Sequence, residues 1–252
     1  MPRTGDIVRS TPDEIAHTRA LVLQYGWNSM AYQILNPGIR RWFSTQFDAV
    51  IGYVEAGGYR VVAGAPVCAP ECLSDVATAF AEDTQRAGKR LCYFGAQERL
   101  ISSMEWCTPA SALLLGAQPS WDPAGWPAII GGKASLRAQL SRARNKHVEI
   151  HEWPAEQATD HPELRRCLSE WLGTRGLPPM RFLVEWNILP RLLDRRVWVA
   201  QREGQVVGYL IATPVPLRQG WLVEQIIRGA KAPNGTNELL LDAAMRTLGE
   251  AG

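Results

Sequence analysis

The chain has 252 residues, of which 46% are hydrophobic and 21% are charged, and its formal net charge is +2 at pH 7. This apolar content is enough to bury a core in one large domain or two smaller ones. The near-neutral charge argues against a protein that coats nucleic acid. DNA is therefore not an expected partner, and any phosphate-binding surface must be local.

The sequence also bears on location. No apolar run approaches the roughly 18 to 20 residues of a membrane helix, and residues 1–14 lack the apolar centre of a signal peptide. We therefore expect a cytoplasmic protein. Peripheral attachment at the inner face of the membrane stays open, because the ten tryptophans would suit a membrane surface.

The first half of the chain predicts alternating helices and strands. Thr11–Glu14 has the pattern of a capping box with proline at the first helical position, and the helix should run to about Tyr25. Further along we expect a hairpin, a helix, a strand, a short helix and a short strand. Their ranges are 50–55 with 59–67, 72–87, 90–94, 98–106 and 112–115.

The second half opens with a segment rich in proline and glycine, 119–132, which is typical of a connection. The elements expected after it are a helix, a strand, a helix, a rigid turn, a hairpin, a strand and a last helix. They cover 135–146, 148–153, 160–172, 177–179, 197–203 with 205–215, 221–227 and about 236 onward.

The two predicted hairpins share a layout. In each, a glycine turn follows a glutamate (Glu55, Glu203), and eleven positions separate that glutamate from a Pro-Val pair. We therefore expect an α/β (α+β) fold of two related units, 1–130 and 131–252, each a mixed, mostly antiparallel sheet with flanking helices. The second unit is expected to be truncated, because the strand that should follow its last helix is missing.

The segment 221–241 is the predicted functional site. Glu224 interrupts an apolar strand, where burying a carboxylate is costly, and Arg228 and Lys231 follow at its end. Asn234-Gly235-Thr236 can then open a helix whose backbone N–H groups and dipole suit an anion. We expect Glu224 and Arg228 to form one cradle at this helix mouth. Ordinary turn chemistry and a simple Glu224–Arg228 ion pair remain the alternatives.

The helix expected near 133–146 is strongly basic and holds no acidic residue. On a helical wheel Lys133, Arg137 and Arg144 lie beside the apolar face, whereas Arg142 and Lys146 lie on the opposite side. A surface that holds phosphates of an RNA acceptor end or of a lipid head group would have this character. A solvated face with cations near a helix C-terminus explains it equally well.

The remaining chemistry-bearing residues predict no metal site. The five cysteines are scattered, and their odd number favours reduced thiols. Cys68 and Cys72 have no second pair to complete a zinc site, and His147 and His151 alone are a weak ligand set.

Four segments resemble one family. GKASLRAQLSRARNKHVEI, REGQVVGYLIATPV, EQIIRGAKAPNGTNELLLDAAM and the upstream FDAVIGYVEAGGYRVVAGAPV resemble the C-terminal catalytic domain of bacterial phosphatidylglycerol lysyltransferases and their stand-alone relatives. The resemblance begins at about residue 20, and its most specific part is Arg228–Glu238. It implies two tandem acetyltransferase-like (GNAT-like) units that transfer an aminoacyl group from aminoacyl-tRNA to a lipid hydroxyl, usually that of phosphatidylglycerol.

The chain departs from that family in three ways. The integral-membrane flippase region is absent, so the acceptor need not be a lipid. Ala65 stands where the larger enzymes often carry an aspartate before Pro-Val. The second unit stops early, so residues beyond Gly252 are an open requirement for activity.

The chemistry implied by the resemblance assigns roles to the predicted site. Glu224 and Arg228 would be catalytic, the first deprotonating the attacking hydroxyl and the second stabilising the oxyanion or holding a phosphate. The substrate would be bound by backbone donors of 234–236 and by the positive charge of Lys231. Glu238 would either cap the helix N-terminus or grip the α-amino group. Arg137, Arg142, Arg144 and Lys146 would bind tRNA or lipid phosphates.

Two other functions stay open. An acyl-CoA-dependent N-acyltransferase would need a loop of backbone donors for pyrophosphate, and Pro233 removes one donor there. A non-catalytic module would bind tRNA or an anionic membrane without transferring anything. No cofactor is expected beyond aminoacyl-tRNA as co-substrate, or acyl-CoA in the alternative. The amino acid, the acceptor and the oligomeric state are left open.

Overall fold

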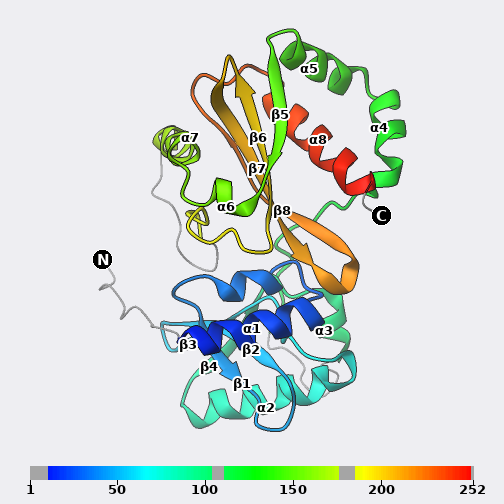
Figure 1. Cartoon of the computed structure of the whole chain (residues 1–252). Helices are drawn as coiled ribbons and strands as arrows, with labels where there is room; N and C mark the ends of the chain where they lie inside the picture. Colours follow the sequence, from blue (N-terminus) through cyan, green and yellow to red (C-terminus); the bar gives the residue numbers. More distant parts are fainter. Residues whose placement is uncertain (1–10, 104–110, 176–184, 251–252) are drawn as a thin grey trace. The chain divides into compact units, whose positions relative to one another are not determined.

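The computed structural model describes residues 11–103, 111–175 and 185–250. Internal contacts divide the chain into two compact units, and each is described by itself. The first comprises 1–116 with 180–186 and 214–221, and the second comprises 117–179, 187–213 and 222–252. Residues 117–130, which the sequence prediction had placed in the first domain, thus belong to the second unit. Each unit contains most or all of a four-stranded sheet flanked by helices (Figure 1).

The sheet of the first unit has the order β1-β2-β3-β4. Strands β1 (Arg40–Phe43), β2 (Val50–Ala56) and β3 (Tyr59–Ala63) pair antiparallel, and β4 (Arg90–Phe94) joins β3 in parallel. The parallel connection needs a crossover, which η2 (Pro70–Cys72) and α2 (Leu73–Arg86) provide. The predicted hairpin, helix and strand are therefore confirmed in this order.

Helices cover both faces of this sheet. On one face Val50 and Val61 pack with α1 (Pro12–Tyr25) and η1 (Ala31–Leu35). On the other face Ile51 and Val62 pack with α2 and α3 (Glu98–Ser103). The split follows from the alternation of side chains along a strand. The predicted start of α1 is confirmed, since the Thr11 hydroxyl accepts the N–H of Glu14 at 3.2 Å.

The sheet of the second unit has the order β5-β6-β7-β8. Strands β5 (Val148–Trp153), β6 (Arg196–Arg202) and β7 (Gln205–Val215) pair antiparallel. β8 (Gly220–Arg228) follows β7 through η4 (Pro216–Arg218). Val207 bonds to Gly229 and Thr213 bonds to Glu224, so β7 and β8 also run in opposite directions. The second predicted hairpin and the additional strand are confirmed.

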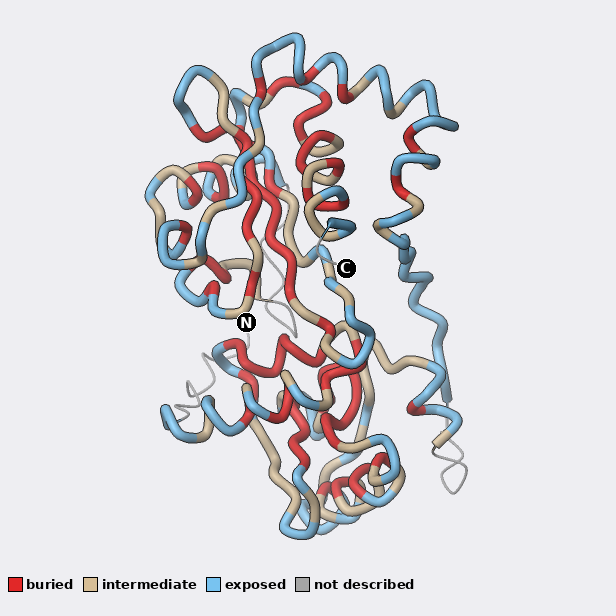
Figure 2. Tube along the Cα trace, turned by 45° about the vertical axis from the view of Figure 1, so that its right-hand side comes forward, coloured by how far each residue is buried: buried red, intermediate tan, exposed pale blue. Residues whose placement is uncertain are grey.

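One face of the second sheet is covered by α5 (Ala134–Arg144) and α8 (Thr236–Glu250). Leu140 and Ala143 of α5, Leu240 of α8 and Trp198 of β6 belong to one buried core, which also includes residues of α4 (Trp126–Gly132). Buried residues occupy the middle of β6 and β7 and part of α8 (Figure 2). α7 (Pro162–Gly173) packs beside β7, where the Cys167 thiol lies 3.7 Å from the Val206 carbonyl oxygen.

Some local predictions were wrong. The strand expected at 112–115 is absent, because residues 111–121 form no regular element and Leu113, Leu114 and Leu115 are 82%, 90% and 63% exposed. The apolar run alone had predicted a strand. The connection expected at 119–132 contains η3 (Pro123–Gly125) and α4, because each of their prolines stands in a first turn, where the missing N–H costs nothing.

Other elements were not predicted or cannot be compared in full. The short strand β1, the turn helix η1 and the four-residue α6 (Ala155–Ala158) were not predicted. Residues 104–106 of the expected helix 98–106 and the turn 177–179 lie outside the described residues. Across the described ranges, none of the helices combines the length and apolarity needed to cross a bilayer.

Candidate functional site

The predicted site lies on β8, the loop 229–235 and the start of α8. The loop is compact, because the N–H of Gly229 donates to the Val207 carbonyl at 2.9 Å and that of Ala232 donates to the Gly229 carbonyl at 3.1 Å. Three polar side chains are exposed: Arg228 at the end of β8, and Lys231 and Asn234 of the loop. The Arg228 guanidinium donates to the Asn234 side-chain oxygen at 3.4 Å. These three side chains form the exposed part of the site.

Glu224 does not join them. Its side chain is 4% exposed and is held by Arg195, whose own side chain is 3% exposed. Arg195 Nε donates to Oε2 at 2.8 Å, Nη2 donates to Oε1 at 3.3 Å, and the Thr213 hydroxyl also donates to Oε2. Arg195 comes from the segment before β6, far from Glu224 in the sequence, which is why no sequence pattern revealed the pair.

The expected cradle of Glu224 and Arg228 is therefore wrong. Four residues of extended strand put their Cα atoms about 13 Å apart. The first is buried against Arg195, and the second is exposed at the strand's end. The catalytic roles predicted for Glu224 and for Arg228 remain proposals.

The mouth of α8 is also less open than expected. Thr236 is fully buried, its N–H donates to the Pro233 carbonyl at 3.3 Å, and its hydroxyl donates to the same oxygen at 2.7 Å. Gly235 has φ +93°, and a Cβ there would lie 2.2 Å from the Gln139 carbonyl oxygen of α5. Close packing against α5 thus turns 235–236 inward. Among the predicted substrate-binding residues, Asn234 and Lys231 thus stay exposed, and Glu238 is half-buried.

A carboxylate of the protein already accepts one backbone N–H of the loop. Glu170 of α7 accepts the N–H of Ala230 at 2.8 Å and pairs with Arg166 at 2.7 Å. These contacts, first the Ala230 N–H and then Arg166, lower the pKa of Glu170, and Lys231 adds a smaller attraction. Arg166 also donates to the Val206 carbonyl at 2.6 Å. Glu170 therefore braces the loop in the manner of a bound anion.

The basic helix follows its wheel only in part, because Lys133, which the wheel placed beside the apolar face, is exposed just before α5. Arg137 donates to the carbonyls of Ile130, at 3.0 Å, and of Gly131, so it caps the end of α4. Arg144 bonds to Asp242 of α8 at 2.8 Å. On the other side, Arg142 donates to the Gln139 side-chain oxygen at 3.3 Å, and Lys146 is exposed. The structure thus gives Arg137 and Arg144 partners within the second unit, although both residues stay exposed, as Arg142 and Lys146 do.

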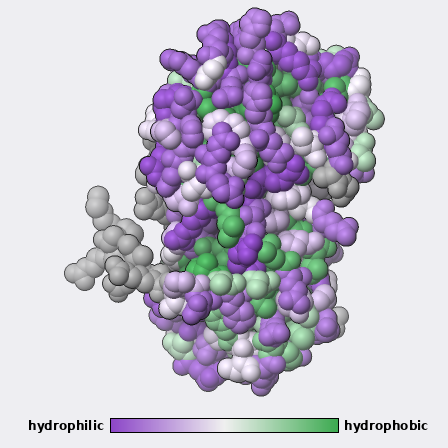
Figure 3. Space-filling view, in the orientation of Figure 1, coloured by the Kyte–Doolittle hydropathy of each residue, from purple (hydrophilic) through white to green (hydrophobic). Residues whose placement is uncertain are grey.

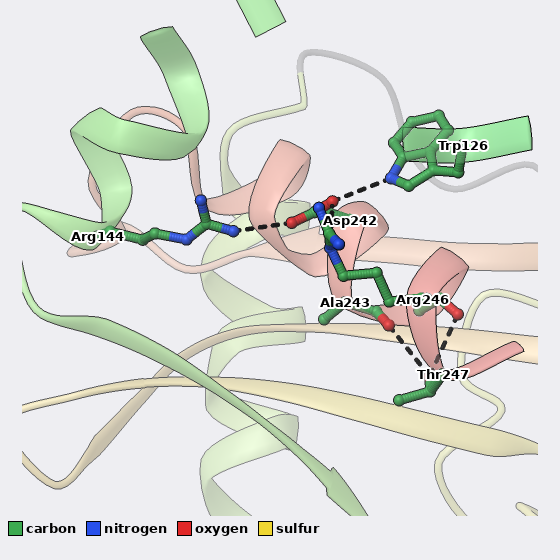
Figure 4. A network of polar contacts seen from close by, with 7 residues as sticks. Trp126, Arg144, Asp242, Ala243, Arg246 and Thr247 are labelled. Atoms are coloured by element: carbon green, nitrogen blue, oxygen red, sulfur yellow. Dashed lines mark hydrogen bonds and ion pairs between the residues drawn. The ribbon is translucent and has the colours of Figure 1, made fainter. Parts of the chain in front are cut away.

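Sequence reasoning missed Asp242. It is 1% exposed and collects Trp126, Arg144 and Arg246 around its two oxygens (Figure 4). The available signal was an acid within the apolar pattern of the last helix, between Leu240 and Ala244. Buried carboxylates need partners, and this one draws them from α4, α5 and α8.

The fold and the site together define an α/β protein whose second unit presents a basic loop where a strand feeds a helix. Comparisons with known proteins identify its family. The model for the C-terminal domain of phosphatidylglycerol lysyltransferase matches residues 19–252. The chain therefore belongs to the family of phosphatidylglycerol lysyltransferase C-terminal domains. No similar sequence is found among curated proteins.

Solved structures share the fold. The C-terminal domain of an Agrobacterium fabrum protein assigned as a lysylphosphatidylglycerol synthetase matches with a TM-score of 0.84 at 22% identity, over 96% of this chain and 77% of the other. L-PGS from Bacillus licheniformis matches with a TM-score of 0.74 at 17% identity, over 96% and 73%. A protein of unknown function from Bacteroides thetaiotaomicron matches with a TM-score of 0.70 at 14% identity, over 97% and 87%.

Proposed function

We propose that this chain transfers an aminoacyl group from aminoacyl-tRNA to a lipid hydroxyl, with phosphatidylglycerol as the first acceptor to test. The observation that carries the proposal is the family match, which spans the whole β8–loop–α8 segment. The proposal includes two acetyltransferase-like units, because hairpins of the same layout occur in both sheets. It also includes a cytoplasmic location, peripheral at the inner face of the membrane.

The proposed reaction needs positioning more than driving force. The acceptor oxygen attacks the carbonyl carbon of the aminoacyl ester, the bond to the ribose oxygen breaks, and the proton of the acceptor hydroxyl ends on that ribose oxygen. An ester replaces an ester, so the step is nearly balanced. Arg228 is proposed to stabilise the oxyanion, because its exposed guanidinium is oriented by Asn234 and lies at the end of a fixed strand.

Lys231, Asn234 and Glu238 are proposed to contact the donor. Lys231 and Asn234 are exposed on the same loop, and Glu238 lies in the first turn of α8, where a carboxylate can meet an α-amino group. Glu224 remains the proposed proton acceptor only if its carboxylate leaves Arg195 and Thr213 during the reaction. Its buried contacts favour a role in holding β8 in place.

A lipid acceptor is supported by apolar surface in the first unit. Three consecutive leucines, 113–115, are largely exposed, and a contiguous exposed apolar group is costly in water unless it meets a partner. A bilayer interface would accept these side chains. The same residues would then keep the protein close to its acceptor.

The contacts of the loop argue against acyl-CoA as the donor. A pyrophosphate would need backbone N–H groups, but Ala230 donates to Glu170, Thr236 donates to Pro233, and Pro233 has none. Isothermal titration with CoA should therefore give no heat of binding. Micromolar affinity would contradict this argument and favour the N-acyltransferase.

The direct test combines purified protein, a set of charged tRNAs with labelled amino acids, and phosphatidylglycerol vesicles. We expect label in the organic phase, and loss of that label in Arg228→Ala with tRNA binding retained. Arg202→Ala is the matched control, because Arg202 pairs with Glu203 on another exposed hairpin. Absence of transfer by the wild type with every amino acid would reject the proposal. Binding without transfer would then favour the non-catalytic module.

A further inference from the structure

The carboxylate of Asp242 organises two arginines from different helices. Its side chain is 2% exposed, and Oδ2 accepts Arg144 Nη2 at 2.8 Å while Oδ1 accepts Arg246 Nε at 3.0 Å. The indole N–H of Trp126 also donates to Oδ1 at 3.0 Å. Figure 4 shows the two guanidinium groups approaching the carboxylate from α5 and α8. Their positions are fixed by one buried anchor.

The cluster carries more positive charge than its anchor requires. One guanidinium is enough to neutralise Asp242, so the second leaves a surplus of one positive charge. The Arg144 and Arg246 side chains are 53% and 48% exposed. A guanidinium has five N–H donors. Within the described ranges, each arginine uses one nitrogen to bond Asp242 and bonds to no other group. The remaining donors are available at the surface.

We propose that Arg144 and Arg246 form a phosphate-binding clamp oriented by Asp242. Both guanidinium groups touch the same carboxylate, so one phosphate can receive N–H donors from both. Charge-assisted bonds of this kind are short and strong, and arginine suits them because its donors form a rigid fork. The shared anchor fixes the arginines before binding and so reduces the ordering cost.

The surface around the clamp favours an RNA phosphate over a membrane. The exposed residues of α5 are polar or small, with no exposed large hydrophobic side chain, and Arg142 lies on this helix with Lys146 just beyond it. Figure 3 likewise shows a mainly hydrophilic surface over this end of the second unit. A membrane face would present apolar side chains there. This inference rests on the proposed function, in which aminoacyl-tRNA supplies the RNA.

The test measures binding of an uncharged RNA hairpin to the full chain at several salt concentrations. Arg144→Gln and Arg246→Gln should each weaken binding, and the double variant should lose about tenfold or more and lower the salt slope by about one. Arg165→Gln is the control, because Arg165 is 55% exposed and also pairs with one aspartate. Thermal unfolding of each variant confirms that it folds. Arg246→Lys, which keeps the charge but not the fork, should fall between wild type and Arg246→Gln.

Two results would overturn the clamp. One is unchanged RNA affinity in the double variant. The other is loss of binding to anionic vesicles with RNA binding intact, which would assign the arginines to a membrane. In the transfer assay, the double variant should show a raised KM for charged tRNA with kcat nearly kept. If the wild type transfers nothing while the RNA result holds, the proposed function fails and the clamp stands.

Discussion

Glu224 and Arg195 form a buried, two-pronged ion pair that fixes β8 to the segment before β6. Both side chains are at most 4% exposed, and Arg195 Nη1 also donates to the Arg191 carbonyl at 2.8 Å. The acid that stood out in the sequence thus has its partner in a different part of the chain. Its first consequence is for stability, because removing either partner leaves a buried charge without compensation.

We expect Arg195→Ala to lower the free energy of unfolding by about 3 to 5 kcal/mol. The matched control is Arg165→Ala, whose pair with Asp160 has side chains 55% and 40% exposed and should contribute at most about 1 kcal/mol. Urea denaturation of both variants measures the difference. Similar decreases in the free energy of unfolding for both variants would show that burial does not make the Glu224–Arg195 pair more important for stability.

Glu170 should make stability depend on pH. Its pKa is lowered from its ordinary value of 4.5, first by the Ala230 N–H and then by Arg166. A carboxylate of this kind stabilises the fold above its unfolded-state pKa, and the contribution is lost as the pH falls through the folded-state pKa.

We therefore expect Glu170→Gln to be less stable than wild type at about pH 7, with the gap closing below about pH 4.5. Denaturant unfolding between about pH 7 and about pH 3 measures both proteins. Glu156→Gln is the control, because Glu156 is an exposed residue of the short helix α6. A gap that stays constant down to about pH 3 would mean that the charge of Glu170 does not hold the loop.

Gly235 should be intolerant of any side chain. Its φ of +93° disfavours other residues, and a Cβ would lie 2.2 Å from the Gln139 carbonyl oxygen. Gly204 has φ +75° but no heavy atom within 4 Å of such a Cβ.

Gly204→Ala should therefore cost only the backbone strain, about 1 kcal/mol. Gly235→Ala should cost about 1 to 3 kcal/mol more, because α5 and α8 must separate. Thermal or urea unfolding decides between them. Equal losses would contradict the close contact of Gly235 with α5.

The exposed leucines should bind vesicles. Replacing Leu113, Leu114 and Leu115 by serine should reduce co-sedimentation with phosphatidylglycerol vesicles, because each buried leucine side chain contributes about 1.5 to 3 kcal/mol at most. Ile101→Ser is the control, since Ile101 is a single exposed side chain at 56%. Undiminished co-sedimentation of the triple variant would remove this segment from the membrane contact.

The elements that the sequence predicted well are those specified by local periodicity. The hairpin at 197–215 alternates apolar residues around a glycine turn, and the strand 148–153 was predicted to the residue. The wheel of the basic helix also placed Arg137 and Arg144 on the side where both find partners, because a helical face is a property of local geometry. The strand predicted from the apolar run 112–115 was wrong, because hydrophobicity alone does not show what a segment packs against.

By itself the sequence determined the two hairpins, the strand and loop leading to the last helix, the side of α5 that carries Arg137 and Arg144, and the resemblance to one family. Only the tertiary structure decided that Glu224 pairs with Arg195, that Glu170 accepts an N–H of the loop, and that Asp242 binds Arg144 and Arg246. The physical reason is that secondary structure depends on neighbours along the chain. A buried carboxylate takes whichever cation or donor the fold brings within about 3 Å, and that choice has no local signature.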